Sequence, residues 1–436
     1  MQIVRLPPGP PGRRLIGNTY DYDLDRLGFL QRCQRVYGDA FRFSKTTTVV
    51  QDPDLIHELF ARTNTDFRTE APLFSGGDRV ERMTTAIPAS MAARRKGWHG
   101  MNRSIAAAHG ARFVTHLDTV LASVADREID PLPVLKSFFG LAVADFCLGG
   151  DAGGVTEVAG AVDAAATAAV AVMESSLTLP RWLPVPRVRR AQLAGARIES
   201  ILHDCLEHRR RSVPADEPRD LLDVLLSPSG PQLADDVVIR TLEAVLRASH
   251  GVPGATLTWA LRELAADPCL VDRIRAEAGR IDTALTSTAV EPSDLPYTEA
   301  LVKELLRVYP PTWLMGRTVL RPARLGEWQF PAGHQVMFSP YLSHRDPRWW
   351  PEPDRFRPER WLEANRPYQG QAYYPFGAGP RICLGNQVGM LQLTLAIARL
   401  ADRYEVLSGN LDQAKPDPRA LLVPKGLRIR LVPRRN

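Results

Sequence analysis

The feature that most constrains this chain is a glycine-rich turn around one cysteine, at residues 375–385 (Pro-Phe-Gly-Ala-Gly-Pro-Arg-Ile-Cys-Leu-Gly). Gly377, Gly379 and Gly385 allow tight turns and a close approach of the backbone to a flat ligand. Cys383 stands directly before an apolar stretch that predicts a helix, and the N-terminal amides and dipole of a helix stabilise a thiolate. The turn therefore predicts a cysteine that acts as a strong anionic axial ligand.

A dinucleotide-binding loop is the alternative for the same glycines, but residues 377–382 lack the third glycine of that fingerprint. The other four cysteines, at positions 33, 147, 205 and 269, are expected to be buried small hydrophobic side chains. The total of five is odd and there is no Cys-x-x-Cys pair. A disulfide framework or a zinc knuckle is therefore not expected.

Hydrophobic periodicity predicts a chain made mainly of helices. Residues 98–284 are rich in Ala, Leu and Arg and predict a succession of helices, and a further helix is expected over 386–404. Short strand-like pieces, such as 48–50 and 335–338, lie outside the long helical stretch. Because the sequence shows no internal repeat and no linker, we expect a single domain over residues 1–436, mainly α with a small β portion.

Charge and hydropathy argue against nucleic-acid binding and membrane insertion. The chain has 55 basic and 49 acidic residues, a net charge of +6 that is too small at this length to indicate nucleic-acid binding but suits an acidic protein partner. The N-terminus lacks the apolar run of a signal peptide, and no window of about 18 apolar residues is free of charge. We therefore expect a soluble, cytoplasmic protein without a membrane anchor.

Three motifs in a fixed order resemble the cytochrome P450 family of haem-thiolate enzymes. The first is the family's haem-binding signature, Phe376-x-x-Gly379-x-Arg381-x-Cys383-x-Gly385. The other two are Glu304-Leu-Leu-Arg307 and Phe356-Arg-Pro-Glu-Arg360-Trp. The resemblance covers essentially the whole chain and implies a cytochrome P450-like fold, haem b as cofactor and Cys383 as the proximal metal ligand. It also implies a structural triad of Glu304, Arg307 and Arg360 that holds the cysteine loop.

The resemblance further implies which residues bind the rest of the haem. Phe376, Gly377 and Gly385 belong to the signature turn, which the family places against the macrocycle. Basic residues stand at the positions where the family neutralises the two propionates: His99, Arg103, Arg317 and Arg381. His99 and Arg103 are four residues apart, so we expect them on one face of a helix.

The sequence departs from the family at the helix that activates oxygen, expected here over residues 234–265. Family members usually carry Ala-Gly-x-acid-Thr in this helix, where the acid and the alcohol relay protons. The corresponding residues, 248–253, are Ala-Ser-His-Gly-Val-Pro. Gly251 therefore stands at the acid position and Val252 at the alcohol position, and neither side chain transfers a proton.

The proline in this stretch predicts a break in the helix. Pro253 has no N–H to offer the Ser249 carbonyl, so the helix is expected to open or kink there. Such an opening admits ordered water. Ser249 and His250 are the candidates to replace the missing acid and alcohol, and the alternative for His250 is a side chain that faces away from the iron.

Segments that the family places next to the substrate are largely apolar: 74–91, 245–252, 311–315 and 421–424. They suit a lipophilic small molecule such as a terpenoid, polyketide or aromatic metabolite. The expected function is monooxygenation of such a molecule with dioxygen, in secondary-metabolite biosynthesis. Because the 436 residues contain no flavin or iron–sulfur domain, electrons are expected from a separate ferredoxin or flavodoxin with its reductase, and Arg94, Arg95 and Lys96 suit an acidic docking partner.

Two other functions stay open. Because Gly251 and Val252 replace the acid and alcohol, the enzyme could instead perform a rearrangement, desaturation, ring closure or peroxide-driven oxidation. The alternative from another class is a haem sensor or scaffold without catalysis.

Overall fold

The computed structural model describes residues 5–13, 17–69, 87–100, 103–149, 154–173, 186–212, 217–278, 291–363 and 371–435. Its internal contacts divide the chain into two compact units, each made of segments far apart in the sequence. Unit 1 comprises Met1–Ile87, Leu306–Arg357 and Glu363–Cys383, and unit 2 comprises Pro88–Leu305, Pro358–Leu362 and Leu384–Asn436. The single domain over residues 1–436 stays a prediction.

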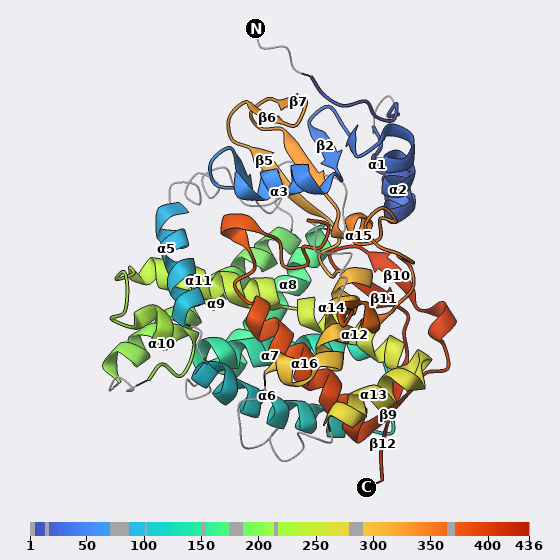
Figure 1. Cartoon of the computed structure of the whole chain (residues 1–436). Helices are drawn as coiled ribbons and strands as arrows, with labels where there is room; N and C mark the ends of the chain where they lie inside the picture. Colours follow the sequence, from blue (N-terminus) through green and yellow to red (C-terminus); the bar gives the residue numbers. More distant parts are fainter. Residues whose placement is uncertain are drawn as a thin grey trace. The chain divides into compact units, whose positions relative to one another are not determined.

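Unit 1 combines a mixed sheet with short helices (Figure 1). Its elements are α1 (Thr19–Leu24), α2 (Arg26–Tyr37), β1 (Ala40–Arg42), β2 (Thr47–Val50), α3 (Pro53–Ala61), β3 (Phe67–Thr69), β5 (Met315–Val319), β6 (Ala323–Leu325), β7 (Trp328–Phe330), β8 (Gln335–Phe338), α15 (Pro340–Ser343) and the 3-10 turn η3 (Gly379–Arg381). The strand order is β1-β2-β8-β5-β3, with β6 and β7 as a separate pair. β2 pairs in parallel with β8, Thr47 opposite Gln335, and all four residues of β2 are buried.

Helix α3 positions the aromatic core of unit 1. Its N-terminus is capped by Asp52, whose side chain accepts from the Leu55 N–H (3.0 Å), and Pro53 occupies the first turn. Near its other end, Phe60 packs edge-on against Phe338 of β8, with ring centroids 5.1 Å apart. This packing fixes the end of α3 beside the sheet.

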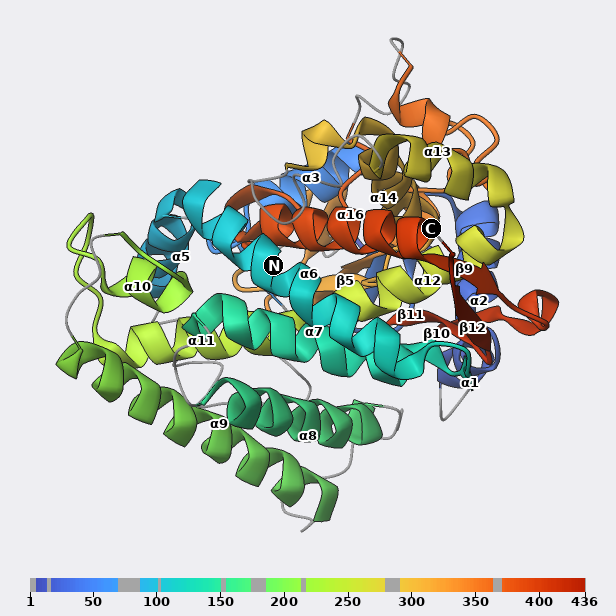
Figure 2. The same cartoon turned by 90° about the horizontal axis from the view of Figure 1, so that it is seen from below.

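Unit 2 is a stack of helices with two small sheets. Its elements are α5 (Ile87–Gly100), α6 (Arg103–Val124), β4 (Glu128–Ile129), α7 (Pro131–Leu148), α8 (Val155–Met173), α9 (Pro186–Arg211), α10 (Leu221–Leu226), α11 (Asp235–Ser249), α12 (Val252–Ala266), α13 (Pro268–Ala278), η1 (Pro292–Asp294), α14 (Pro296–Val308), η2 (Pro358–Trp361), α16 (Asn386–Arg403), β9 (Tyr404–Leu407), η4 (Leu411–Gln413), β10 (Lys415–Pro418), β11 (Leu422–Lys425) and β12 (Ile429–Pro433). The first residue of α5 and the last turn of α14 belong to unit 1. In Figure 2, α9 lies on α8, α8 on α7, and α7 beside α6 and α12.

Helix α7 lies at the centre of this stack. Asp130 caps its N-terminus by accepting from the Leu132 N–H (3.1 Å), and Gly149 ends it with a φ of 75°. Within the described residues it is the one helix long and apolar enough to cross a membrane by length and composition, and 61% of it is buried in the fold. Such burial is typical of the core helix of a globular unit.

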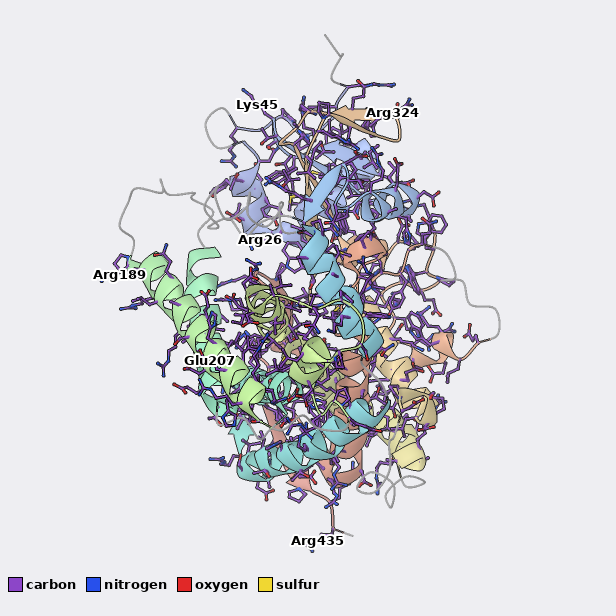
Figure 3. All side chains as sticks on the ribbon, turned by 90° about the vertical axis from the view of Figure 1, so that its left-hand side faces the viewer. Arg26, Lys45, Arg189, Glu207, Arg324 and Arg435 are labelled. Atoms are coloured by element: carbon purple, nitrogen blue, oxygen red, sulfur yellow. The ribbon has the colours of Figure 1, made fainter. Side chains whose placement is uncertain are left out.

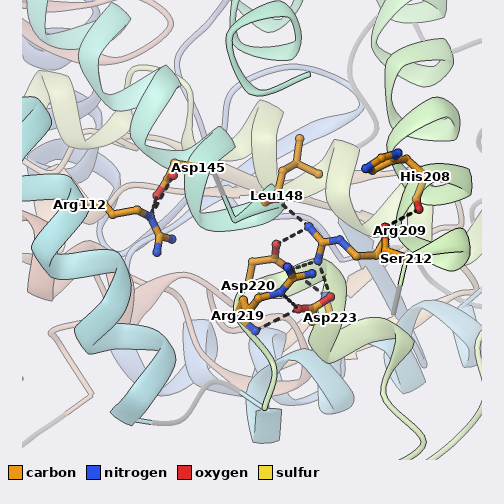
Figure 4. A network of polar contacts seen from close by, with 9 residues as sticks. All are labelled: Arg112, Asp145, Leu148, His208, Arg209, Ser212, Arg219, Asp220 and Asp223. Carbon is orange, nitrogen blue, oxygen red and sulfur yellow. Dashed lines mark hydrogen bonds and ion pairs between the residues drawn. The ribbon is translucent and has the colours of Figure 1, made fainter. Parts of the chain in front are cut away.

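A buried ion-pair network ties α9 to α10 and α7 (Figure 4). Arg209 donates to both carboxylate oxygens of Asp220, at 3.0 and 2.8 Å, and to the Leu148 carbonyl at 2.9 Å. Burial alone would raise the pKa of Asp223, but hydrogen bonds from Arg219 and Arg209 hold it below its usual value. Two guanidiniums thus balance two carboxylates, and the network fixes the packing of α9.

Most of the fold-level expectations are confirmed. The chain is mainly helical with small sheets. Three of the four remaining cysteines are buried, but the prediction was wrong for Cys269, which is exposed. Cys269 lies at the start of α13, where its N–H donates to the Asp267 side chain (2.9 Å) and the first turn faces solvent.

Candidate functional site

Cys383 ends a glycine-dependent turn and is the last residue of unit 1. Gly377 and Gly379 have φ values of 69° and 67°, in the left-handed region that favours glycine. A Cβ on Gly379 would lie 2.5 Å from the Phe60 carbonyl oxygen, so a larger residue does not fit. The Cys383 N–H donates to the Phe376 carbonyl (2.8 Å), and the Cys383 side chain is exposed on the unit.

Two of the predicted propionate-binding residues gather at the end of α3. The Arg317 Nε donates to the Thr63 hydroxyl (3.1 Å), and the Arg381 Nε donates to the Asn64 side-chain oxygen (3.1 Å). Arg317 is buried, with its guanidinium 5.4 Å from the centre of the Phe60 ring. Because residues 63 and 64 are neighbours in the chain, the two guanidiniums are held on the same part of unit 1.

These residues fit the haem that the sequence predicts. An exposed thiol follows a backbone that two glycines bring into a tight turn, so Cys383 would hold the iron. Planar guanidiniums are suited to carboxylates, so Arg317 and Arg381 would bind the propionates. Phe376 and Gly377 belong to the same turn.

The remaining predicted haem contacts lie in unit 2. Gly385 caps the N-terminus of α16 with a φ of −89°, which any residue adopts, and nothing lies within 4 Å of a Cβ built on it. Its close approach to a flat ligand stays a prediction. His99 belongs to α5, whereas Arg103 begins α6. His99 and Arg103 therefore do not share one helical face, as they lie in different helices. Their side chains lie outside the described part of the chain.

The expected break in the helix predicted over residues 234–265 is confirmed. In place of one helix over residues 234–265 there are two, α11 and α12, separated by His250 and Gly251. His250 is extended (ψ 114°) and Gly251 is left-handed (φ 82°). The reason is the missing N–H of Pro253 together with the freedom of a glycine two residues earlier.

Side chains from α7 and the β10–β11 hairpin border the break. A Cβ on Gly251 would lie 3.3 Å from Lys136 Cε and 3.4 Å from Leu421 Cδ1, so these two side chains fill the space at the acid position. Gly254, one turn into α12, packs against the backbone of α7, since a Cβ there would lie 3.1 Å from the Lys136 nitrogen. Val252, at the alcohol position, is half-buried.

His250 has a specific partner on α8. Its Nε2 lies 2.9 Å from Asp163 Oδ1, and a Cβ on Gly140 of α7 would lie 3.8 Å from the imidazole Cδ2. The ring is therefore held between α7 and α8. Ser249, the other candidate replacement, is the last residue of α11 and half-buried.

The structural triad is observed in part. Glu304 accepts from Arg360 Nε (3.0 Å) and from Trp361 Nε1 (2.9 Å), all within unit 2 and fully or nearly fully buried. Arg307 is fully buried in unit 1. Its guanidinium donates to the carbonyls of His344 (2.8 Å), Pro353 (2.7 Å) and Arg355 (3.1 Å). Arg307 thus holds the proline-rich loop between residues 344 and 355.

The structure alters two other expectations. Lys96 is buried and its ammonium donates to the carbonyls of Ser227 (2.7 Å) and Pro231 (3.1 Å), so it is not available to an acidic partner. Burial also lowers the pKa of Lys96.

Among the segments expected to face the substrate, residues 74–86 lie outside the described part of the chain. Trp313 and Leu422, from two of the other segments, are buried.

Sequence reasoning missed Asp163 and Lys136. Asp163 is 87 residues from His250 in the chain, and nothing in the local pattern of α8 distinguishes it. To find either residue from the sequence, one would have to know how α7 and α8 pack against residues 250 and 251. The glycine at position 140, which leaves room for the imidazole, is the one local signal.

Solved structures with the same fold cover the whole chain. A structure titled "Retinoic acid bound cyanobacterial CYP120A1" superposes with a TM-score of 0.81 at 20% identity, over 99% of this chain and 100% of that one. At this identity the likeness shows the fold alone, and it agrees with the mainly helical fold with small sheets.

Sequence relatives and a family model show which family the chain belongs to. The cyclooctat-9-en-7-ol 5-monooxygenase of Streptomyces melanosporofaciens is 32% identical over 51% of this chain and 50% of its own length. Cyclooctatin synthase of the same organism is 32% identical over 58% of this chain and 56% of its own length. The chain thus matches about half the length of these curated relatives. The family model described as Cytochrome P450, however, matches residues 7–431, so the chain belongs to the cytochrome P450 family.

Proposed function

We propose that this protein is a haem-thiolate oxidoreductase that monooxygenates a hydrophobic small molecule with dioxygen in secondary-metabolite biosynthesis, in the cytoplasm. The observation that carries the proposal is the exposed Cys383 thiol at the end of its glycine turn, within a chain of the cytochrome P450 family. Haem b, when bound there, supplies the redox chemistry that activates oxygen.

The protein's own side chains bind and orient the cofactor. Cys383 provides the anionic ligand, and its N–H bond to the Phe376 carbonyl fixes the direction of the turn. Arg317 and Arg381 hold propionates, with His99 and Arg103 as further cations. Because the Arg317 guanidinium is buried between aromatic rings, its hydrogen bonds to a carboxylate are stronger than they would be in water.

The substrate is proposed to be a lipophilic metabolite such as a terpenoid, polyketide or aromatic compound. The apolar character of residues 311–315 and 421–424 supports this class, as does the name of the relative that acts on cyclooctat-9-en-7-ol. Leu422 is anchored because its carbonyl accepts from Trp259 Nε1 (3.1 Å), which holds the β10–β11 hairpin on α12. This anchor places Leu421 against the helix break.

Electrons are proposed to come from a separate ferredoxin or flavodoxin with its reductase. Arg95 is exposed on α5 and Arg94 is half-buried, and together they suit an acidic partner. Lys96 is excluded from this role by its burial.

The helix break favours a second candidate reaction. With a left-handed glycine at the acid position and valine at the alcohol position, the usual side-chain relay is missing at residues 251 and 252. The second candidate is a rearrangement, desaturation, ring closure or peroxide-driven oxidation. Of these, a redox-neutral rearrangement and a peroxide-driven oxidation take up no net protons, so they do not require the missing relay. A haem sensor or scaffold is the alternative without catalysis.

The proposal is tested first by the spectrum of the reduced, carbon-monoxide-bound protein. The wild type should show the red-shifted Soret band of thiolate ligation, and Cys383→Ala should lose it. Cys269→Ala is the matched control because Cys269 is also exposed but lies outside the turn. Retention of the band in Cys383→Ala would refute the ligand assignment.

Turnover then separates the candidate reactions. Oxygenated product formed with NADPH, a ferredoxin and its reductase supports monooxygenation, whereas product formed only with hydrogen peroxide supports the second candidate. Substrate binding that shifts the Soret band without product under either condition supports the sensor.

A further inference from the structure

The break between α11 and α12 carries a buried imidazole that one carboxylate connects to solvent. His250 Nε2 lies 2.9 Å from Asp163 Oδ1. The His250 side chain is 8% exposed, whereas that of Asp163 is 59% exposed. His250 also directly precedes Gly251, the residue at the position of the missing acid. An imidazole, which can accept a proton on one ring nitrogen and donate one from the other, thus lies one hydrogen bond from an exposed carboxylate.

We infer that Asp163 and His250 form a proton-entry route that delivers protons from solvent to the helix break, in place of the acid and alcohol that Gly251 and Val252 lack. The inference rests on the proposed function, because monooxygenation consumes protons. Oxidation of R–H by dioxygen takes up two electrons and two protons and yields R–OH and water. The redox partner supplies the electrons, and this route supplies the protons.

The transfer at the imidazole balances without a net change of charge. The Asp163 carboxylate takes a proton from solvent and passes it to His250 Nε2 while Nδ1 releases its own proton toward the break. Asp163 is then a carboxylate again, and exchange of the ring tautomer restores the starting state. Each cycle moves one proton inward.

The broken backbone provides an acceptor at Ser249, the residue directly before His250. In a continuous helix the Ser249 carbonyl would receive the N–H of residue 253, but Pro253 has none. That carbonyl and the Ser249 hydroxyl are therefore suited to hold a water that accepts the Nδ1 proton. The left-handed Gly251 turns the chain at this point.

Residues of α7 and of the β10–β11 hairpin border the break around His250 and Gly251. α7 presents Gly140, which leaves room for the ring, and Lys136, whose stem lies against Gly251. Of the charged side chains in the described residues, Asp163 of α8 contacts the His250 ring and Lys136 of α7 lies against Gly251. The β10–β11 hairpin presents the apolar Leu421. Asp163 is thus the carboxylate through which His250 meets solvent.

The inference is tested with two relay variants and one matched control. His250→Gln keeps an N–H for Asp163 but does not carry a proton, and Asp163→Asn keeps the hydrogen bond but loses the acid. Glu157→Gln is the control, because Glu157 lies on the same helix, is 51% exposed and pairs with Arg197 of the neighbouring helix α9. All are compared as haem-loaded protein with the reconstituted redox partner.

Both relay variants should release about 10-fold more hydrogen peroxide per NADPH than the wild type, since general acids typically contribute 10² to 10⁴ in rate and water replaces part of this. The double variant should release no more hydrogen peroxide per NADPH than either single variant, because each single substitution already blocks the same route. Substrate affinity, measured from the Soret shift, should stay unchanged, and the solvent isotope effect on turnover should rise. Glu157→Gln should match the wild type in every measurement.

A readout independent of turnover is the ring ¹⁵N NMR signal of His250 in reduced, carbon-monoxide-bound holoenzyme with labelled histidine. Loss of the carboxylate in Asp163→Asn should shift the Nε2 signal, because its hydrogen-bond partner is then a neutral amide, and Glu157→Gln should leave it unchanged. An unmoved Nε2 signal in Asp163→Asn overturns the coupling of the two groups.

Wild-type coupling in His250→Gln or Asp163→Asn also overturns the route. Uncoupling accompanied by weaker substrate binding and an unchanged isotope effect assigns the pair a purely structural role and overturns it as well. Failure of the proposed function looks different, because the wild type itself would then lack the thiolate spectrum or any oxygenated product.

Discussion

At the scale of single residues, the two glycines of the cysteine turn differ in what a side chain would meet. Both have positive φ, so alanine at either should cost about 1 to 2 kcal/mol of unfolding free energy. Gly379→Ala should cost more than Gly377→Ala, because its Cβ would lie 2.5 Å from the Phe60 carbonyl, compared with 3.7 Å from the Phe60 ring. Urea unfolding and the yield of haem-loaded protein measure the difference.

The control for these variants is Gly409→Ala, since nothing lies within 4 Å of a Cβ at that position. Its stability should stay within about 0.5 kcal/mol of the wild type. Equal stability of Gly379→Ala and Gly409→Ala would contradict the turn geometry.

Gly251 gives the second prediction at this scale. Restoring the family's pair with Gly251→Glu and Val252→Thr should not improve coupling, because a non-glycine residue at φ 82° costs about 1 to 2 kcal/mol and its Cβ would crowd Lys136. The doubly substituted protein should unfold at lower urea concentration and release as much peroxide as the wild type. Gly140→Ala is the control, since its Cβ would make only an ordinary contact with His250 (3.8 Å). Wild-type stability of the double variant would show that the break closes into a continuous helix.

At the scale of elements, Arg307 holds the loop between residues 344 and 355 through three carbonyls. Arg307→Ala should leave these acceptors buried and unsatisfied, and should lower the free energy of unfolding by roughly 3 to 5 kcal/mol. Little soluble haem protein should form. Arg355→Ala is the matched control in the same loop, because its pair with Glu352 is exposed and such pairs contribute about 0 to 1 kcal/mol. A normal yield of stable Arg307→Ala would contradict the clamp.

Helix α5 gives a prediction about electron delivery. Charge reversal in Arg95→Glu should slow reduction by an acidic ferredoxin roughly 5-fold at low salt, which corresponds to about 1 kcal/mol. The effect should fade above about 0.1 M salt, where the Debye length is roughly 10 Å. Stopped-flow reduction measures it, with Arg190→Glu on α9 as the control because Arg190 is also exposed. Equal rates for both variants would remove α5 as the docking site.

The elements that sequence patterns predicted well are those with local causes. Pro253 lacks an N–H and Gly251 tolerates positive φ, so the break follows from two residues that are two positions apart. The cysteine turn likewise depends on Gly377 and Gly379. Helix α9 shows where local patterns no longer predict the structure. Arg189 and Glu207, near its two ends, are exposed (Figure 3), but Arg209, two residues after Glu207, is buried and pairs with Asp220.

At the scale of the whole molecule, long-range pairing was beyond the sequence patterns. The parallel pairing of β2 with β8 joins residues nearly 300 positions apart. The partner of His250 comes from helix α8, and the partners of Lys96 come from the loop between α10 and α11. Lys96 was mistaken for a surface charge because its neighbours are arginines. Its ammonium instead meets carbonyls that only the folded chain brings to it. Tertiary packing, rather than propensity, decides such cases.

Three buried histidines of the described residues make the stability of the molecule depend on pH. Burial lowers the pKa of His334 to about 4 and that of His344 to about 3, and desolvation also lowers the pKa of His109. In the unfolded chain these groups titrate near 6.5. Between pH 4 and 6.5 the unfolded chain therefore binds more protons than the folded one, so stability rises with pH in this window and levels off above it.

The predicted measurement is urea unfolding of the haem-loaded protein between pH 4.5 and 7.5. The midpoint should fall as the pH drops below about 6.5, and His334 alone should contribute on the order of 3 kcal/mol over the window. In His334→Gln the pH slope of the unfolding free energy should decrease by up to one proton, about 1.4 kcal/mol per pH unit, because glutamine does not titrate. The fold should be kept, because the glutamine amide still reaches the Thr48 hydroxyl that His334 contacts at 3.0 Å. The control is His203→Gln, because His203 is an exposed histidine on α9, and it should show the wild-type slope. A slope that His334→Gln leaves unchanged would mean that His334 binds its proton equally in the folded and unfolded chains, which its buried position between the Thr48 hydroxyl and the Phe330 ring argues against.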